Sequence, residues 1–91
     1  MVTIKEGDIV VSYKRFGALP SDLKRCPNMY LYKIIGIAPN CSLDSEDTTM
    51  VIYQSLYHKN PQLFVRDIGD FFAFIFDAGR YRFEKWEGEV V

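Results

Sequence analysis

The stretch 48–66 contains two runs rich in β-branched and aromatic residues, separated by His-Lys-Asn-Pro at residues 58–61. A short polar break with Asn and Pro between two such runs is typical of a β-hairpin loop. With residues 58–61 as the loop, Tyr53 pairs with Arg66 across the two strands. The pattern therefore predicts a hairpin, and successive side chains along each strand point to opposite faces.

The predicted register divides this hairpin into an aromatic and an aliphatic face. The aromatic face carries Tyr53, Tyr57, Phe64 and Arg66, and the aliphatic face carries Met50, Ile52, Leu56, Leu63 and Val65. The composition of the aliphatic face predicts that it belongs to the core. The aromatic face is either a second packing surface or a surface that meets a partner.

Two further strands are predicted upstream, at residues 9–13 and 30–38, from their apolar and alternating pattern. Gly36 interrupts the second of these strands, which indicates a bulge, a tight bend or a close approach of another backbone segment. The loop between the two strands holds one predicted helical turn at residues 21–24, with Ser21 as its N-cap.

A second hairpin is predicted from residues 71–76 and 81–86, with residues 77–80 as its loop. This pairing makes one face almost wholly aromatic, with Phe72, Phe74, Phe76, Tyr81 and Phe83. A shift of the pairing by one residue would place rings opposite arginines, so the pattern favours this register.

The spacing of the strands predicts one all-β domain that spans residues 1–91. At this length we expect a small SH3-like, partly open barrel of five or six antiparallel strands, with at most one short helical turn. Residues 86–91 are expected to form a frayed tail.

Composition and charge narrow the classes of function. With 48% hydrophobic and 25% charged residues, the chain is of the globular type, and its net charge of −1 gives no long-range attraction to nucleic acid or an anionic membrane. The start of the chain lacks a signal pattern, and no apolar run approaches the ~20 residues that span a bilayer. We therefore expect a cytoplasmic protein with no membrane partner.

The cysteines and the histidine predict no metal centre. Cys26 and Cys41 lack the Cys-x-x-Cys spacing, and His58 is the one histidine, which is too few for a usual zinc site. A disulfide between the two cysteines is permitted, but nothing in the sequence requires it. We expect neither a metal nor a cofactor.

Several segments together resemble a known family. They are residues 31–38 (Leu-Tyr-Lys-Ile-Ile-Gly-Ile-Ala), residues 51–57 (Val-Ile-Tyr-Gln-Ser-Leu-Tyr), Phe64-Val65-Arg66, Phe71 and Arg82-Phe83. In order and spacing they are similar to the small bacterial domain of unknown function catalogued as number sixteen-fifty-three. The resemblance covers residues 30–83. It implies an SH3-type barrel, and it implies no activity because none is established for that family.

The chain also departs from the family pattern. Family members begin with Tyr-Arg-His-Phe-Lys-Gly, whereas this chain has Tyr13-Lys14-Arg15-Phe16-Gly17, or Lys24-Arg25-Cys26-Pro27 in an alternative alignment. The family's His-Ser-Glu-Thr segment is Pro39-Asn40-Cys41-Ser42 here. If the family uses those histidines, this chain has lost or altered their site.

No residue is predicted to be catalytic. A nucleophile needs a base within hydrogen-bond reach, and His58 at a hairpin tip is the only candidate base. Asp67 and Asp70 follow Arg66 closely, and we expect them to cap backbone amides or to pair with that arginine. Enzymatic activity is therefore the least favoured of three hypotheses.

The favoured hypothesis is a non-catalytic module that binds a protein or peptide through an aromatic and arginine face or through a sheet edge. The candidate binding residues are Tyr53, Tyr57, Phe64, Arg66 and Arg82. Packing of the same rings into the interior is the competing explanation, because small barrels fill themselves with aromatic residues. A homodimer is a further candidate assembly. RNA binding is a weaker alternative that needs Lys14-Arg15 and Lys24-Arg25 to converge on Tyr53 and Arg66.

Overall fold

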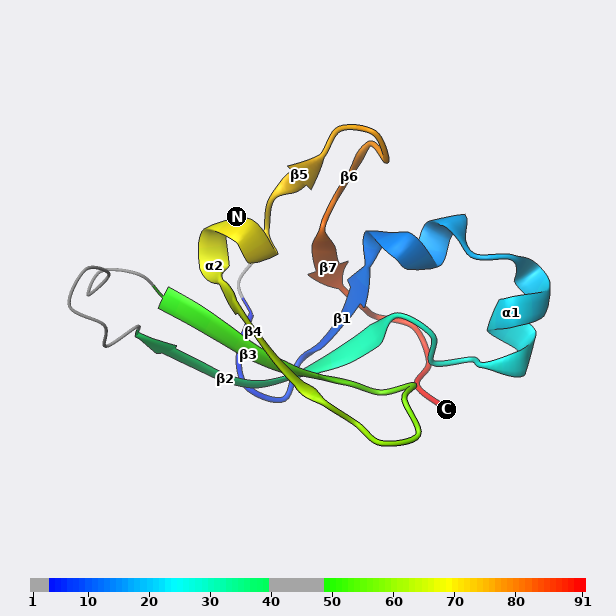
Figure 1. Ribbon diagram of the computed structural model, residues 1–91, viewed down its shortest axis with the longest axis horizontal. Coiled ribbons are helices and arrows are strands. Elements are labelled where there is room, and N and C mark those ends of the chain that lie inside the picture. Colours follow the sequence, from blue (N-terminus) through cyan, green and yellow to red (C-terminus); the bar gives the residue numbers. More distant parts are fainter. Residues whose placement is uncertain (1–3, 40–48) are drawn as a thin grey trace.

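The computed structural model describes residues 4–39 and 49–91 and shows a curled antiparallel sheet with short helices at its margins (Figure 1). Its elements are β1 (Ile9–Ser12), the 3-10 helix η1 (Tyr13–Gly17), α1 (Pro20–Arg25), β2 (Leu31–Pro39), β3 (Thr49–Ser55), β4 (Leu63–Asp67), α2 (Ile68–Phe71), β5 (Phe74–Ile75), β6 (Arg80–Tyr81) and β7 (Phe83–Lys85). Five strands form one sheet in the order β4-β3-β2-β1-β7, and β5 and β6 form a separate ribbon. The domain is therefore the predicted all-β, partly open barrel, with β4 and β7 as the two ends of its sheet. The closer likeness to SH3 domains stays a prediction.

The bulge predicted at Gly36 is present. The pairing of β2 with β3 shifts register between Ile34 and Gly36, so that Ile34 pairs with Tyr53 while Gly36 pairs with Ile52. An unpaired extra residue bends a strand and increases its twist. This bend lies in the longest strand of the sheet and helps the sheet to curl.

The helices differ from the prediction in number and in their caps. The expected helical turn is α1, but Leu19 is its N-cap and Pro20 opens it, so Ser21 does not cap it. η1 and α2 exceed the single turn that the pattern predicts. At α2 the predicted cap is confirmed, because the Asp67 carboxylate accepts a 2.8 Å hydrogen bond from the Asp70 N–H.

The central hairpin forms from β3 and β4, with a register two residues away from the predicted one. Tyr53 pairs with Phe64, and the connection runs through residues 56–62. A shift of two residues keeps every side chain on its predicted face, since the side-chain period of a strand is two. Alternation alone therefore could not distinguish the two registers. Beyond Ser55, whose N–H donates to the Gln62 carbonyl at 3.4 Å, the Leu56 N–H donates to the Leu31 carbonyl on the β2 side at 3.0 Å.

The core lies on the face opposite to the one predicted. Its buried residues are Ile4, Val10, Ile34, Val51, Tyr53, Phe71 and Phe83. The aliphatic face is the outer one: Met50, Ile52 and Leu56 are half-buried, and Leu63 and Val65 are each 60% exposed. The reason is the direction in which the sheet curls. Phe71 from α2 and Phe83 from β7 stack at 4.4 Å and cover the aromatic face of the hairpin.

The second hairpin is only partly as predicted. Phe74 pairs with Tyr81 in the β5–β6 ribbon, again two residues away from the expected register, and Phe71 belongs to α2 rather than to a strand. Beyond Tyr81 the chain leaves the ribbon, and β7 pairs with β1. The prediction of one continuous aromatic face is therefore wrong. Phe83 enters the core, whereas Phe76 at the tip of the ribbon is 87% exposed.

The tail is held against the rest of the domain. Asn28 makes two hydrogen bonds with the backbone of Val91, at 2.7 and 2.9 Å. The Trp86 indole N–H donates to the Glu89 carbonyl at 3.2 Å. These contacts replace the frayed end expected at residues 86–91. Within the described residues, no helix is long and apolar enough to cross a bilayer.

Candidate functional site

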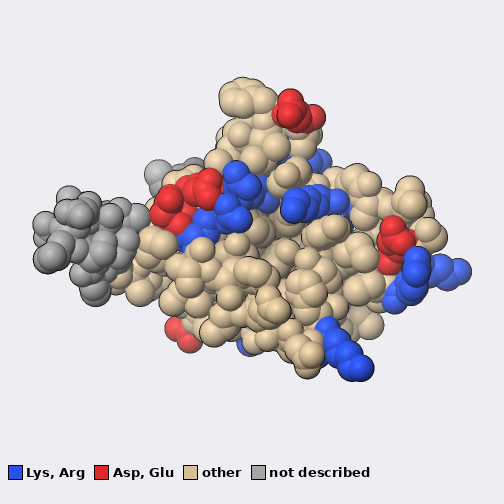
Figure 2. Space-filling model, in the orientation of Figure 1, with Lys and Arg blue, Asp and Glu red and all other residues tan. Residues whose placement is uncertain are grey.

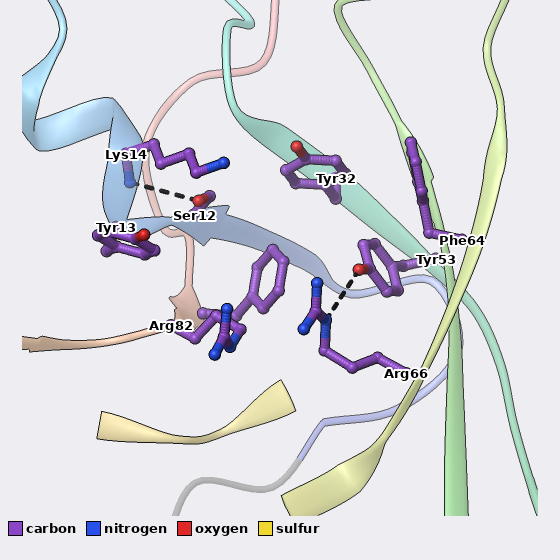
Figure 3. Close-up of a pocket in the computed structure, with 9 residues that line it drawn as sticks. Ser12, Tyr13, Lys14, Tyr32, Tyr53, Phe64, Arg66 and Arg82 are labelled. Carbon is purple, nitrogen blue, oxygen red and sulfur yellow. Dashed lines mark hydrogen bonds between the residues drawn. The ribbon is translucent and has the colours of Figure 1, made fainter. Parts of the chain in front are cut away.

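A pocket of about 200 Å³ lies where the two ends of the curled sheet approach each other (Figure 3). It is lined by Ser12, Tyr13, Lys14, Tyr32, Tyr53, Phe64, Arg66, Arg82 and Phe83. Phe64 and Arg66 come from β4 at one end of the sheet, and Phe83 comes from β7 at the other. We call this the opening pocket, because it lies at the gap between β4 and β7, where the barrel is not closed.

Aromatic rings form the floor of the opening pocket. Tyr53 is 4% exposed, and its ring stacks on Phe64 with centroids 5.5 Å apart. Tyr32 and Phe83 meet the Tyr53 ring edge-on at 5.5 and 5.2 Å. Such edge-to-face and offset contacts are the preferred arrangements of aromatic pairs. The floor is therefore a packed part of the core rather than a loose surface.

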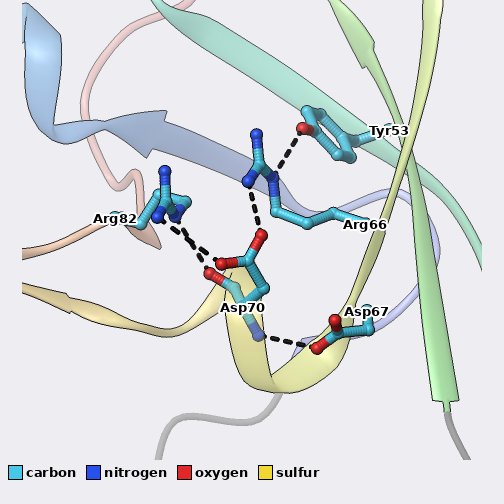
Figure 4. A network of polar contacts seen from close by, with 5 residues as sticks. All are labelled: Tyr53, Arg66, Asp67, Asp70 and Arg82. Atoms are coloured by element: carbon cyan, nitrogen blue, oxygen red, sulfur yellow. Dashed lines mark hydrogen bonds and ion pairs between the residues drawn. The ribbon is translucent and has the colours of Figure 1, made fainter.

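Arg66 and Arg82 lie next to this floor, and both contact the carboxylate of Asp70 (Figure 4). The Arg66 Nε donates to the Tyr53 hydroxyl at 3.3 Å, and its Nη1 donates to Asp70 Oδ2 at 2.6 Å. The Arg82 Nε donates to the Asp70 carbonyl at 3.0 Å, and its Nη2 lies 3.5 Å from Asp70 Oδ1. The predicted pairing of Arg66 with an acid of this turn is confirmed, and the acid is Asp70.

Both arginines are partly accessible, and the surroundings of Arg66 favour its charged form. The hydrogen bond to the Tyr53 hydroxyl raises the pKa of Arg66 above its ordinary value, and the bond to Asp70 acts in the same direction. The side chains of Arg66 and Arg82 are 33% and 26% exposed, so each still presents N–H groups toward solvent. Guanidinium groups present several fixed donors and bind carboxylates in a bidentate manner.

Lys14 adds a third cation to the rim. It is an exposed residue of η1, and its side chain lines the pocket (Figure 3). Among the described residues it forms no ion pair, whereas Asp70 is shared by Arg66 and Arg82. Lys14, Arg66 and Arg82 thus form a cationic rim around the pocket, and the aromatic floor contains no cation. Figure 2 shows Lys and Arg side chains gathered on this face next to a smaller acidic patch.

The structure brings together four of the five predicted binding residues. Tyr53, Phe64, Arg66 and Arg82 line the opening pocket, whereas Tyr57 does not. Tyr57 instead shares a 3.0 Å hydroxyl–hydroxyl hydrogen bond with Tyr32. Burial raises the pKa of both hydroxyls, and this bond raises that of Tyr32 further.

The candidate binding residues chosen from the sequence omit several members of the pocket: Ser12, Tyr13, Lys14, Tyr32 and Phe83. Tyr32 shares one face of the predicted strand 30–38 with Tyr30 and Ile34, but this pattern does not show which face is covered. Lys14 is named as a contact under the RNA alternative alone, because its place near Phe64, Arg66 and Phe83 depends on β4 and β7.

His58 does not line any of the described pockets, and its strongest contact is with Ser55. Its Nδ1 lies 2.6 Å from the Ser55 Oγ, and its ring packs on Tyr57 at 4.3 Å. A serine and a histidine at this distance are the parts of a nucleophile and its base. Ser55, however, is only 1% exposed, so a substrate carbonyl has no path to its hydroxyl. This contact stabilises the turn after β3.

The described residues contain no cluster of three or more His, Cys, Asp or Glu side chains that could hold a metal ion. Cys26 forms no disulfide within the described part of the chain, and Cys41 lies outside it. The site therefore offers hydrogen-bond donors, positive charge and aromatic surface.

Comparison with known proteins finds no match: no family model, no curated protein and no solved structure matches this chain. Membership of the bacterial domain family number sixteen-fifty-three therefore stays a prediction from the resemblance of the residues.

Proposed function

We propose that this protein is a non-catalytic binding module that holds an acidic segment of a protein or peptide partner in the opening pocket. The observation that carries the proposal is the convergence of Lys14, Arg66 and Arg82 on an aromatic floor, with one carboxylate, Asp70, between two of them. The pocket keeps an excess of positive charge although the whole chain has a net charge of −1. A carboxylate entering it gains charge-assisted hydrogen bonds, which are stronger than neutral ones.

The size of the pocket supports a side chain as its occupant. Small-molecule sites enclose roughly 300–1,000 Å³, and the opening pocket encloses about 200 Å³. It is also open to solvent on one side, which leaves room for the main chain of a ligand to remain outside. An Asp or Glu side chain fits this volume, and the apolar stem of Glu would lie against Phe64.

The RNA alternative receives less support, because the basic residues that it requires do not converge. Arg15 donates to the carbonyls of Pro27 and Met29 at 2.9 and 2.8 Å. Arg25 pairs with Asp22 on α1 at 2.9 Å. Of the four basic residues only Lys14 reaches the opening pocket. The Tyr53 ring is also too buried to stack on a base.

A fluorescein-labelled peptide of three Glu-Val repeats, measured by fluorescence anisotropy, tests the proposal. We expect saturable binding that weakens as salt is raised, since ions screen exposed charges. The matching peptide of Gln-Val repeats should bind more weakly. The substitution Lys14→Ala should weaken binding of the Glu peptide roughly two- to five-fold, the effect of one exposed charge pair.

Lys24→Ala is the matched control, because Lys24 is an exposed lysine on α1 outside the pocket. Equal affinities for Lys14→Ala and Lys24→Ala would show that the opening pocket is not the binding site. Tighter binding of a single-stranded RNA oligomer than of the Glu peptide, with a steep salt dependence, would favour the RNA alternative.

A further inference from the structure

The outer edge of β4 is an open edge of the sheet. Among the described residues β4 pairs with β3 alone, and it contains no Pro; its charged residues are Arg66 and Asp67, which disfavour a partner strand of like charge at those positions. Leu63 and Val65, whose side chains lie on the outer face of the sheet, are each 60% exposed. An exposed edge of this kind can accept another extended segment.

The hydrogen-bond pattern shows which backbone groups this edge offers. The Ser55 N–H donates to the Gln62 carbonyl at 3.4 Å, which makes these two residues a hydrogen-bonded pair. Such pairs alternate along an antiparallel ladder, so Phe64 and Arg66 direct their backbone groups toward β3. Leu63 and Val65 therefore direct their N–H and C=O groups away from the sheet.

The same edge borders the opening pocket. Phe64 and Arg66, whose side chains line the pocket, alternate along β4 with Leu63 and Val65 on the opposite face. A segment added to β4 would keep this alternation, because directly opposed residues in paired strands share a face. Every second side chain of the segment would point toward Arg66 and Lys14, and the others would lie beside Leu63 and Val65.

We infer that the partner's segment adds to β4 as an extended strand, with acidic residues facing the opening pocket and apolar residues on the outer face. This inference rests on the proposed function and names its mode of recognition. Backbone hydrogen bonds to Leu63 and Val65 supply sequence-independent affinity, and the alternating side chains supply specificity.

The charges at the pocket select this occupant over a second copy of the chain. If β4 of another copy occupied the edge, its inward residues would be Phe64 and Arg66. That arginine would approach the cations already gathered there, and like charges placed directly opposite each other destabilise a strand pair. An acidic segment places the opposite charge at the same positions.

Peptides of equal composition test the alternation. The three Glu-Val repeats should bind at least five-fold more tightly than a peptide with three Glu followed by three Val. Methylation of the backbone nitrogens that face β4 should weaken binding at least ten-fold, because it removes the main-chain donors without changing a side chain.

A matched pair of substitutions on the protein tests the edge itself. Val65→Pro removes an outward N–H that β3 does not use, and prolines are tolerated on edge strands at such positions. Val65→Thr changes the side chain and keeps the N–H. We expect Val65→Pro to abolish the preference for the alternating peptide and Val65→Thr to retain it. If Val65→Pro does not fold, the methylated peptide decides the question.

The outcomes separate this inference from the proposed function. If Lys14→Ala weakens binding while alternating, block and methylated peptides bind equally, then the pocket is the site and the added strand is wrong. If Lys14→Ala binds like the wild type, the proposed function fails together with the inference. Loss of affinity on methylation, with Lys14→Ala also weakened, supports both.

Discussion

Tyr53 belongs to the core and to the candidate site at the same time. Its ring packs against Phe64, Phe71 and Phe83 at 5.2–5.5 Å, and its hydroxyl accepts a hydrogen bond from Arg66. Core packing and a place in the candidate site, which the sequence presents as alternatives, therefore occur together in one side chain. The buried ring holds the floor rigid, and the hydroxyl orients the guanidinium above it.

Phe71 should be the most sensitive of the core positions. It is fully buried and contacts the rings of Tyr53 and Phe83. We expect Phe71→Ala to lower the free energy of unfolding by about 3–5 kcal/mol, because it removes apolar contacts and leaves a cavity. Leu63→Ala, at an exposed position of β4, should cost less than about 1 kcal/mol. Urea denaturation followed by circular dichroism measures both, and equal losses would contradict the assignment of the inner face.

Tyr32 should make the stability of the domain sensitive to alkaline pH. Burial, together with the Tyr57 hydroxyl, raises the pKa of Tyr32 far above the ~10 of an exposed tyrosine. The folded protein therefore resists ionisation of Tyr32, whereas the unfolded chain loses that proton near pH 10. This linkage leaves stability intact below pH ~10 and lowers it as the pH rises beyond that value.

The substitution Tyr32→Phe separates these two effects. At pH 7 it removes the 3.0 Å bond to Tyr57 and should cost about 1 kcal/mol. Between pH 9 and pH 11, values chosen to bracket the ~10 of a free tyrosine, its unfolding free energy should fall less steeply than that of the wild type. Urea midpoints across this range provide the measurement, and parallel slopes would show that Tyr32 ionises normally.

At the scale of elements, α2 connects the two ends of the sheet. Asp67 caps the helix, which positions Asp70 to receive Arg66 from β4 and Arg82 from the segment before β7. Four residues of helix thus hold the rim of the opening pocket in place. Under the proposed function, the Asp70 carboxylate would compete with an acidic ligand for these two guanidinium groups.

Asp70→Asn should therefore change stability and binding in opposite directions. We expect the free energy of unfolding to fall by about 1 kcal/mol, since the amide is a weaker acceptor than the carboxylate. Affinity for the peptide of Glu-Val repeats should rise roughly two- to five-fold, because two cations lose their internal counter-charge. Asp22→Asn, which removes an exposed pair with Arg25, is the control. Weaker peptide binding by Asp70→Asn would count against ligand competition.

The amide protons of β4 should exchange with solvent in an alternating pattern. Phe64 and Arg66 bond to β3, whereas the N–H groups of Leu63 and Val65 face outward. In the free protein we expect the amides of Leu63 and Val65 to exchange much faster, because an amide without a hydrogen-bond partner is unprotected. Hydrogen exchange followed by NMR measures this, and uniform protection along the strand would mean that the edge is already covered.

On the scale of the whole molecule, the C-terminal residues belong to the same cooperative unit as the sheet. The Arg15 guanidinium lies 4.8 Å from the centre of the Trp86 ring, and Val91 is bonded to Asn28. Contacts between residues 63 positions apart in sequence form only when the domain is folded. The tail should therefore unfold together with the sheet, in one transition.

Trp86 is the single tryptophan and reports on this coupling. We expect its fluorescence and the far-ultraviolet circular dichroism to change with the same urea midpoint, as coincident probes do in a two-state transition. Asn28→Ala removes both side-chain bonds to Val91 and should shift the fluorescence transition to lower urea. A fluorescence change that precedes the dichroism change in the wild type would show an independent tail.

Local features of the fold could be predicted from residues close together in the sequence. The bulge at Gly36, the helical turn at residues 21–24 and the cap formed by Asp67 each depend on neighbours within a few positions. The hairpin at residues 48–66 also follows from its own pattern of strands and break. In these cases the backbone preference and the hydrogen-bond partner lie within one short segment.

The tertiary structure alone decided which side of that hairpin is buried. Alternation separates Tyr53 from Val65, but the face that becomes core is the one that Phe71 and Phe83 cover, and both come from later elements. A register shift of two residues leaves the alternation unchanged, so local pattern could not set the pairing either. That Lys14 and Arg66 line the same pocket likewise depends on the curl of the whole sheet. For this hairpin the sequence determined the two strands and their two faces, and long-range contacts determined which face is core, where the sheet edge lies and what lines the pocket.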